Sequence, residues 1–280
     1  MKLSQKLVVG YFRAKLNMLS LISKKMAAVS AFNLFCTPLR KSRAKTPPVF
    51  SKGEPLEFTI NDHKIRGYRW NHPSSKKVLI VHGFESSSKN FERYVNALIK
   101  KEYEVLMFDA PAHGRSSGRR ITLPLYMATI RRIYDLYGPV DAFIGHSFGG
   151  LVLSHFLETL PRNEQGKVVF IAPATEMVTS IDFFFKFLHL GDDVRKEFDK
   201  IILEKGGFDA SHYSMRRTMK NIEADVLWFH DEEDELTPIG DALKVRDDSH
   251  PNVRFYISNG LGHRRIYRDN NIFRETIDFL

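Results

Sequence analysis

The sequence predicts an α/β protein built on a doubly wound, mostly parallel sheet of eight strands. Two observations support this prediction. Short apolar runs recur along residues 56–280, and segments with helical periodicity separate most of them. Such runs suit parallel strands that are covered on both faces, and their alternation with helices is typical of a doubly wound sheet. The length of 280 residues and the 43 % share of hydrophobic residues suit one large domain with insertions.

The first two strands are predicted as a hairpin, because residues 56–60 and 64–70 alternate apolar and polar side chains around Asn61 and Asp62. The other six strands are short apolar runs at 78–81, 105–108, 142–144, 168–171, 226–229 and 253–257. Helices are predicted near 89–101, 123–136, 148–160 and 265–280.

One connection between predicted strands is too long for a simple crossover. Between Ile171 and Val226 lie 54 residues, whereas a complete crossover needs about a dozen. Residues 176–222 have a helical pattern, and we expect them to form a cap inserted over the sheet. The insertion contains four phenylalanines, and we favour the core of the cap over a binding pocket as their place: Phe183, Phe184, Phe185 and Phe187.

The net charge of +9 belongs to one end of the chain. Residues 1–50 contain ten Lys or Arg and no Asp or Glu, so the rest of the chain is close to neutral. A nucleic-acid-binding domain carries its basic residues on the folded body. We therefore expect no nucleic-acid partner.

Residues 1–30 predict a basic amphipathic helix, since Lys and Arg separate apolar residues at Leu3, Leu7, Phe12, Leu16, Leu19 and Met26. Three interpretations stay open: packing on the protein itself or a second subunit, peripheral contact with anionic lipid, and an organelle-targeting leader. Residues 37–55 predict a linker, because Pro47 and Pro48 forbid a regular helix there. We therefore divide the chain into an N-terminal segment, 1–45, and a domain, 46–280.

Cys36 is the single cysteine, so no intrachain disulfide can form and no oxidising compartment is required. Neither paired cysteines nor a His-x-x-x-His pattern indicates a metal, and we expect no cofactor. No apolar run approaches the roughly 20 residues that span a bilayer. We expect a cytoplasmic protein that is free or peripheral at a membrane, and the sequence leaves its oligomeric state open.

The central motif is Gly-His-Ser-Phe-Gly-Gly at residues 145–150. It follows the predicted strand 142–144 and precedes the predicted helix 148–160. A nucleophile elbow needs this strand–turn–helix arrangement, in which a serine sits on a tight turn at the carboxyl edge of the sheet. The motif therefore indicates Ser147 as a nucleophile, with an ordinary helix N-cap as the alternative.

At this motif the chain resembles the α/β-hydrolase family, and the resemblance covers residues 56–280. Four segments support it: the strand and His-Gly turn at 78–84, the loop Asp-Ala-Pro-Ala-His-Gly-Arg-Ser at 109–116, the acidic loop 228–238, and Gly-Leu-Gly-His-Arg at 260–264. Ala112 stands where the family usually has glycine.

The resemblance implies a catalytic triad of Ser147, Asp234 and His263, in the chain order that this fold uses. It implies an oxyanion hole formed by the backbone N–H groups of Phe84 and Phe148. Asp234 is preferred as the acid because it lies four residues before Pro238. The alternatives are that Asp231 or Glu176 is the acid and that His263 is a solvated loop residue. We expect the side chains of His82, His146 and Asp109 to support the surrounding turns.

The resulting hypothesis is a serine hydrolase that cleaves a carboxylic ester or related acyl bond through an acyl-enzyme intermediate. Its substrate is expected to be a small to medium, apolar acyl compound. Thioester, amide or C–C bond hydrolysis and acyl transfer to an alcohol remain open on the same fold. So does a non-catalytic binding protein, because fold alone does not establish activity.

Overall fold

The computed structural model describes residues 3–39 and 45–280, and they fall into two compact units. We call residues up to 37 together with 176–213 the helical unit, and residues 38–175 together with 214–280 the sheet unit. Each unit is described by itself. The sequence-based division into 1–45 and 46–280 assigns the N-terminal segment and the insertion to different parts, whereas the structure groups them in one unit.

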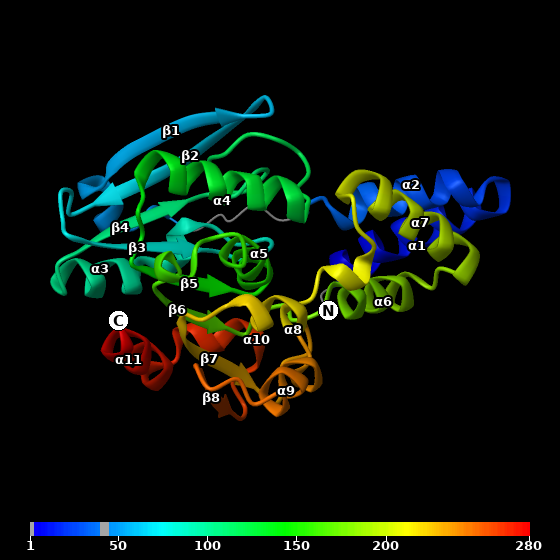
Figure 1. Ribbon diagram of the computed structural model, residues 1–280. Coiled ribbons are helices and arrows are strands. Elements are labelled where there is room, and N and C mark those ends of the chain that lie inside the picture. Colours follow the sequence, from blue (N-terminus) through cyan, green and yellow to red (C-terminus); the bar gives the residue numbers. More distant parts are fainter. Residues whose placement is uncertain (1–2, 40–44) are drawn as a thin grey trace. The chain divides into compact units, whose positions relative to one another are not determined.

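The sheet unit contains eight strands in the order β1-β2-β4-β3-β5-β6-β7-β8 (Figure 1). β2 pairs antiparallel with β1 and β4, and all the other pairs are parallel. This confirms the predicted doubly wound, mostly parallel sheet of eight strands. The strands are β1 (Glu54–Ile60), β2 (His63–Trp70), β3 (Lys76–Val81), β4 (Tyr103–Phe108), β5 (Ala142–His146), β6 (Lys167–Ile171), β7 (Asp225–Asp231) and β8 (Val253–Ser258).

Helices of the sheet unit pack on both faces of the sheet because alternate strand residues point to opposite sides. Val78 and Ile80 share one apolar cluster with α3 (Glu92–Lys100) and α11 (Asn270–Phe279). On the other face, the ring of Phe143 lies 6.2 Å from that of Phe156 in α5 (Phe148–Leu157). The remaining helices of this unit are α4 (Leu123–Tyr137), α8 (Met215–Thr218), α9 (Ile239–Asp247) and α10 (Gly262–Arg265).

Two loop predictions have different outcomes. Asn61 and Asp62 form the predicted hairpin turn, with φ of 44° and 62°, the left-handed backbone that two-residue hairpins require. The linker predicted over 37–55 is wrong at its end, where Pro48–Lys52 form a 3₁₀ turn on the domain. Phe50 is buried against the rings of Tyr68 and Trp70. Part of the predicted linker, residues 40–44, lies outside the described residues.

The helical unit consists mainly of α1 (Leu3–Ile22), α2 (Lys24–Phe35), α6 (Met177–Leu188) and α7 (Asp192–Gly206). The single helix predicted over 1–30 is therefore two helices. Ser23 separates them with an extended backbone, and its side chain caps α2 by accepting from the N–H of Met26. α1 packs on α2 and α6, and α2 packs on α7. The interpretation that the N-terminal segment packs on the protein itself therefore holds for this buried side of α1 and α2.

Aromatic rings form much of the interior of the helical unit. Phe198 of α7 contacts Phe32 and Phe35 of α2 and Phe184 and Phe185 of α6. Two of the four phenylalanines of the insertion thus lie in its core, whereas Phe183 and Phe187 are exposed. The predicted insertion, 176–222, extends too far, because the segment from Ser214 onward belongs to the sheet unit. Within the part of the chain that the structure describes, no helix is long and apolar enough to cross a bilayer.

Candidate active site

Ser147 occupies a strained turn between β5 and α5. Its φ of 55° and ψ of −129° are sparsely populated for a residue with a side chain and cost about 1–3 kcal/mol. The turn is tight enough to require glycine at its flanks. A Cβ atom on Gly149 would lie 2.4 Å from the carbonyl oxygen of His82, and one on Gly145 would lie 2.8 Å from the Cα of Gly150. This geometry matches the predicted nucleophile elbow.

Three predicted side chains from separate loops form one chain of hydrogen bonds. His263 Nε2 lies 2.9 Å from the Oγ of Ser147, and His263 Nδ1 lies 2.7 Å from the Oδ2 of Asp234. Ser147 follows β5, Asp234 follows β7 and His263 follows β8, so the three residues meet at the carboxyl edge of the sheet. The alternative of a solvated loop residue at 263 is wrong for this structure, because the His263 side chain is only 10 % exposed.

The carboxylate of Asp234 is fully buried and has a partner on each oxygen. Oδ1 accepts from the backbone N–H groups of Leu236 and Thr237, and Oδ2 accepts from the hydroxyl of Thr237 as well as facing His263. Burial raises the pKa of Asp234, but the hydrogen bonds from His263 and Thr237 outweigh burial and lower the pKa overall. The carboxylate is therefore ionised at neutral pH. The sequence analysis missed the contribution of Thr237.

The neighbouring Asp231 binds backbone instead of the imidazole. Its carboxylate accepts from the N–H groups of Gly262, Leu261 and Glu233 and from the hydroxyl of Ser258. Burial raises the pKa of Asp231, and these four donors more than offset that effect. Asp231 thus holds the loop that carries the imidazole of residue 263. Glu176, the other alternative acid, precedes α6 in the helical unit.

Two buried histidines hold the turn after β3. His82 Nδ1 lies 2.8 Å from the carbonyl oxygen of Gly83, and its Nε2 accepts from the N–H of Ala110. His113 Nε2 accepts from the N–H of Glu85. Together these contacts orient the peptides on both sides of Phe84. The support expected from His82 is therefore present, whereas the sequence analysis did not single out His113.

His146 and Asp109 also lie near the site. The buried ring of His146 packs 5.2 Å from the ring of His263 and 4.8 Å from that of Tyr267. Asp109 orders its loop as expected, because its carboxylate accepts from the N–H groups of Ser88 and Arg115. Neither ring nitrogen of His146 has a hydrogen-bond partner among the described residues, so His146 contributes by packing, whereas Asp109 holds its loop by hydrogen bonds.

Comparison with known proteins finds similar sequences over part of the chain and similar folds over most of it. The family described as serine aminopeptidase, S33, matches residues 72–198. The fold is similar to that of the Pyrococcus furiosus esterase Pf2001, with a TM-score of 0.65 and 22 % identity over 88 % of this chain and 97 % of that one. The mouse α/β hydrolase domain-containing protein 10 has a TM-score of 0.59 and 16 % identity over 80 % and 96 % of the two chains. The chain has the α/β-hydrolase fold.

The curated relatives are similar to this chain over part of their length. A serine hydrolase-like protein of Danio rerio is 27 % identical over 147 residues, which cover 51 % of this chain and 44 % of that protein. A human serine hydrolase-like protein is 34 % identical over 111 residues, 38 % of this chain and 54 % of its own. The chain thus spans about half the length of these relatives. The predicted family resemblance is confirmed.

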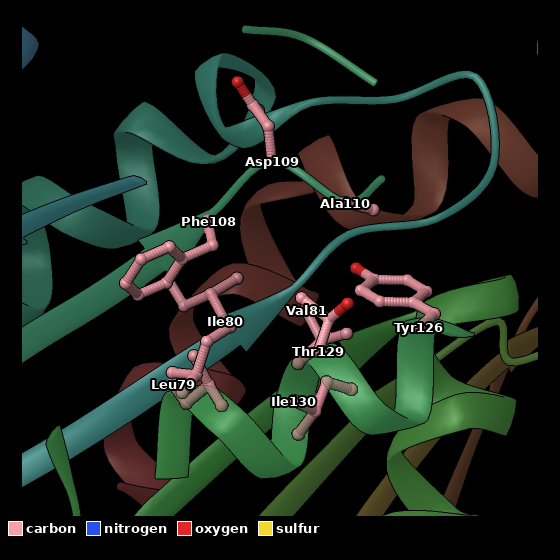
Figure 2. Close-up of a pocket in the computed structure, with 10 residues that line it drawn as sticks. Leu79, Ile80, Val81, Phe108, Asp109, Ala110, Tyr126, Thr129 and Ile130 are labelled. Atoms are coloured by element: carbon pink, nitrogen blue, oxygen red, sulfur yellow. The ribbon is translucent and has the colours of Figure 1, made fainter. Parts of the chain in front are cut away.

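A small cavity lies at the end of β3 (Figure 2). Its volume of about 10 Å³ is near the lower limit for one water molecule, so it does not admit an acyl substrate. Most of its lining is apolar and comes from β3 and β4 on one side and from α4 on the other: Leu79, Ile80, Val81, Phe108, Asp109, Ala110, Tyr126, Thr129, Ile130 and Ile133. We regard it as a packing defect behind the site. Across residues 3–39 and 45–280, no three His, Cys, Asp or Glu side chains gather to ligate a metal.

The buried histidines predict acid sensitivity of the fold. Burial lowers the pKa of His113 to about 4, whereas an unfolded histidine titrates near 6.5. Between these two pH values, the histidine is protonated in the unfolded chain and neutral in the folded chain. The contribution of His113 to the free energy of unfolding is therefore fully present above pH 6.5 and is lost as the pH decreases toward 4. The variant His113→Gln keeps an acceptor for the backbone N–H of Glu85. On acidification from neutral pH to about pH 4.5, its free energy of unfolding should decrease by about 2 kcal/mol less than that of the native protein.

Urea denaturation of both proteins near neutral pH and near pH 4.5 measures this difference. His82 and His146 also have lowered pKa values from burial, so the substituted protein keeps part of the sensitivity. An equal loss of unfolding free energy in the two proteins would show that His113 does not contribute.

Proposed function

We propose that this α/β hydrolase is a serine hydrolase that cleaves a carboxylic ester through an acyl-enzyme intermediate. The observation that supports it most is the unbroken hydrogen-bond chain from Ser147 through His263 to Asp234. A serine hydroxyl is a weak nucleophile at neutral pH and needs an adjacent base to remove its proton. The imidazole lies at the distance that this transfer requires.

In the proposed reaction, Ser147 Oγ attacks the carbonyl carbon of the ester while His263 Nε2 takes the hydroxyl proton. The same proton then passes to the leaving alcohol, and a water molecule hydrolyses the acyl-enzyme by the reverse sequence of transfers. The ionised carboxylate of Asp234 keeps the proton of the neutral imidazole on Nδ1 and stabilises the imidazolium that forms.

The proposed donors to the developing oxyanion are the backbone N–H groups of Phe84 and Phe148. Phe148 is the first residue of α5, and first-turn amides have no acceptor within their helix. Among the residues that the structure describes, none accepts a hydrogen bond from the Phe84 amide. This amide shares a peptide plane with the Gly83 carbonyl, which faces His82 Nδ1. Backbone N–H groups that are already oriented before the reaction stabilise the transition state without a reorganisation cost.

Two kinds of acyl bond fit this mechanism, and the names of similar proteins include both an esterase and a serine aminopeptidase. We favour the ester. An aminopeptidase must also bind the cationic amine of its substrate, and the carboxylates of Asp231 and Asp234 already have partners. The apolar character of the acyl group stays a prediction.

We expect a fluorophosphonate probe to label the native protein and p-nitrophenyl esters to be hydrolysed. Among esters of increasing acyl length, kcat/KM should rise with apolar surface before it declines. Amino-acid p-nitroanilides, tested in parallel, should react at least about 100-fold more slowly, because Asp231 and Asp234 already have partners and are not available to bind their amine. Faster cleavage of the anilides would identify an aminopeptidase. A protein that neither reacts with the probe nor cleaves any substrate would favour the non-catalytic alternative.

A further inference from the structure

The outward side of α1 is apolar. Soluble helices normally bury one apolar stripe and expose polar residues. α1 does bury a stripe, since Leu16 is only 1 % exposed within the protein, but its opposite side also carries large apolar residues. Together with two residues of α2, these form what we call the α1–α2 apolar face: Leu7, Val8, Tyr11, Met18, Leu21, Ile22, Met26 and Val29.

The part of this face that is most open to solvent lies at the end of α1. Leu21 and Ile22 are 85 % and 77 % exposed, at the end of α1 next to the Ser23 break. Apolar residues that cluster on a helical surface in this way are typical of a site that contacts another apolar phase. Because the stripe buried by α1 already supplies its packing in the helical unit, the fold does not need the exposed one.

Three exposed lysines lie along the α1–α2 apolar face. Lys15 lies within it on α1, and Lys24 and Lys25 begin α2; all three are exposed. None of the three forms an ion pair within the described part of the chain. Lysines in the first turn of a helix also oppose its dipole, which favours acidic residues there. Their position is therefore unfavourable for the helix, and it indicates an external anion.

We propose that the α1–α2 apolar face binds the surface of an anionic lipid bilayer. α1 lies in the plane of the interface, its apolar residues enter the boundary between headgroups and acyl chains, and the three lysines contact lipid phosphates. An anionic bilayer offers an apolar phase and negative charge together. A second copy bound across a two-fold axis would instead bring lysines against lysines, since the same face meets itself.

The test is co-sedimentation of the full chain with vesicles. We expect binding to vesicles of phosphatidylserine and phosphatidylcholine, weaker binding to pure phosphatidylcholine, and release at high salt. Leu21→Ser with Ile22→Ser should weaken binding at least about tenfold, because each side chain contributes by burial of apolar surface. Lys24→Gln with Lys25→Gln should weaken binding to the anionic vesicles about 30-fold, since each lysine near such a surface contributes about fivefold.

Two matched controls accompany these variants. Lys196→Gln with Lys200→Gln makes the same charge change on α7, where Asp193 and Glu197 pair with the two lysines. Leu136→Ser removes an exposed leucine of α4 in the sheet unit. Both should keep native binding, and all variants should keep a native circular dichroism spectrum.

Three results would overturn the proposal: no sedimentation with either vesicle, equal loss of binding in the control variants, or a solution dimer that Leu21→Ser with Ile22→Ser dissociates. The last result would assign the face to a second copy. Because the readout is binding and not turnover, the outcome is independent of the proposed ester hydrolysis.

Discussion

Replacing Ser147 by alanine is expected to abolish labelling by a fluorophosphonate probe and to lower kcat by about 10⁶-fold. The hydroxyl of Ser147 is the atom that faces His263 Nε2, so its removal leaves the base without a proton to accept and the substrate without a nucleophile. The fold should be unaffected, because alanine keeps the Cβ atom of Ser147 and therefore the packing of the turn. Labelling intensity and steady-state turnover of the best p-nitrophenyl ester measure the effect.

Ser154→Ala is the matched control for this variant. Ser154 lies seven residues further along the chain, inside α5, and its hydroxyl donates to the carbonyl of Leu151. The control makes the same chemical change away from the imidazole and should retain labelling and turnover within a few-fold. Labelling that survives in Ser147→Ala would remove Ser147 from the mechanism.

The second large effect is expected from Asp234→Asn, with a loss of about 10⁴-fold in kcat near neutral pH. Two backbone N–H groups, those of Leu236 and Thr237, bind Oδ1, so the oxygen of the new amide stays on that side. Its NH₂ group then faces His263 and donates to Nδ1. The imidazole proton is displaced to Nε2, and the base can no longer accept the proton of Ser147.

Asp231→Asn is the control for Asp234→Asn, because it removes an equally buried carboxylate three residues away. Asp231 binds three donors of the segment that precedes His263 and the N–H of Glu233 in its own loop, so its loss should cost about 1–3 kcal/mol of unfolding free energy. At temperatures where it is folded, this variant should turn over the ester far faster than Asp234→Asn does. The opposite ranking of kcat would make Asp231 the catalytic acid.

The parts of this protein that are predictable from sequence are those in which neighbours along the chain determine the structure. The hairpin at Asn61 and Asp62 needs only a turn that accepts positive φ between alternating strands. The elbow at Ser147 likewise depends on a strand, two glycines and a helix that are consecutive in the chain. Such local requirements leave a recognisable pattern, and the alternation of strands and helices then predicts a doubly wound, mostly parallel sheet.

Long-range contacts left no such pattern. Asp231 and Asp234 are the same residue type in one acidic loop, and their partners on β8 and beyond decide which of them faces the imidazole. Nothing in the sequence indicates that His113 holds the peptide of Glu85, 28 residues earlier. The prediction of a linker over 37–55 failed for the same reason, since Phe50 is ordered by rings on β2.

The sequence by itself determined the fold class and the elbow at Ser147, because each depends on periodicity or on residues close in the chain. Only the tertiary structure decided which carboxylate reaches the imidazole and that residues 3–37 pack with 176–213. Both depend on groups far apart in sequence that fit by shape and hydrogen bonding, and helical periodicity records that a face is apolar but not what covers it.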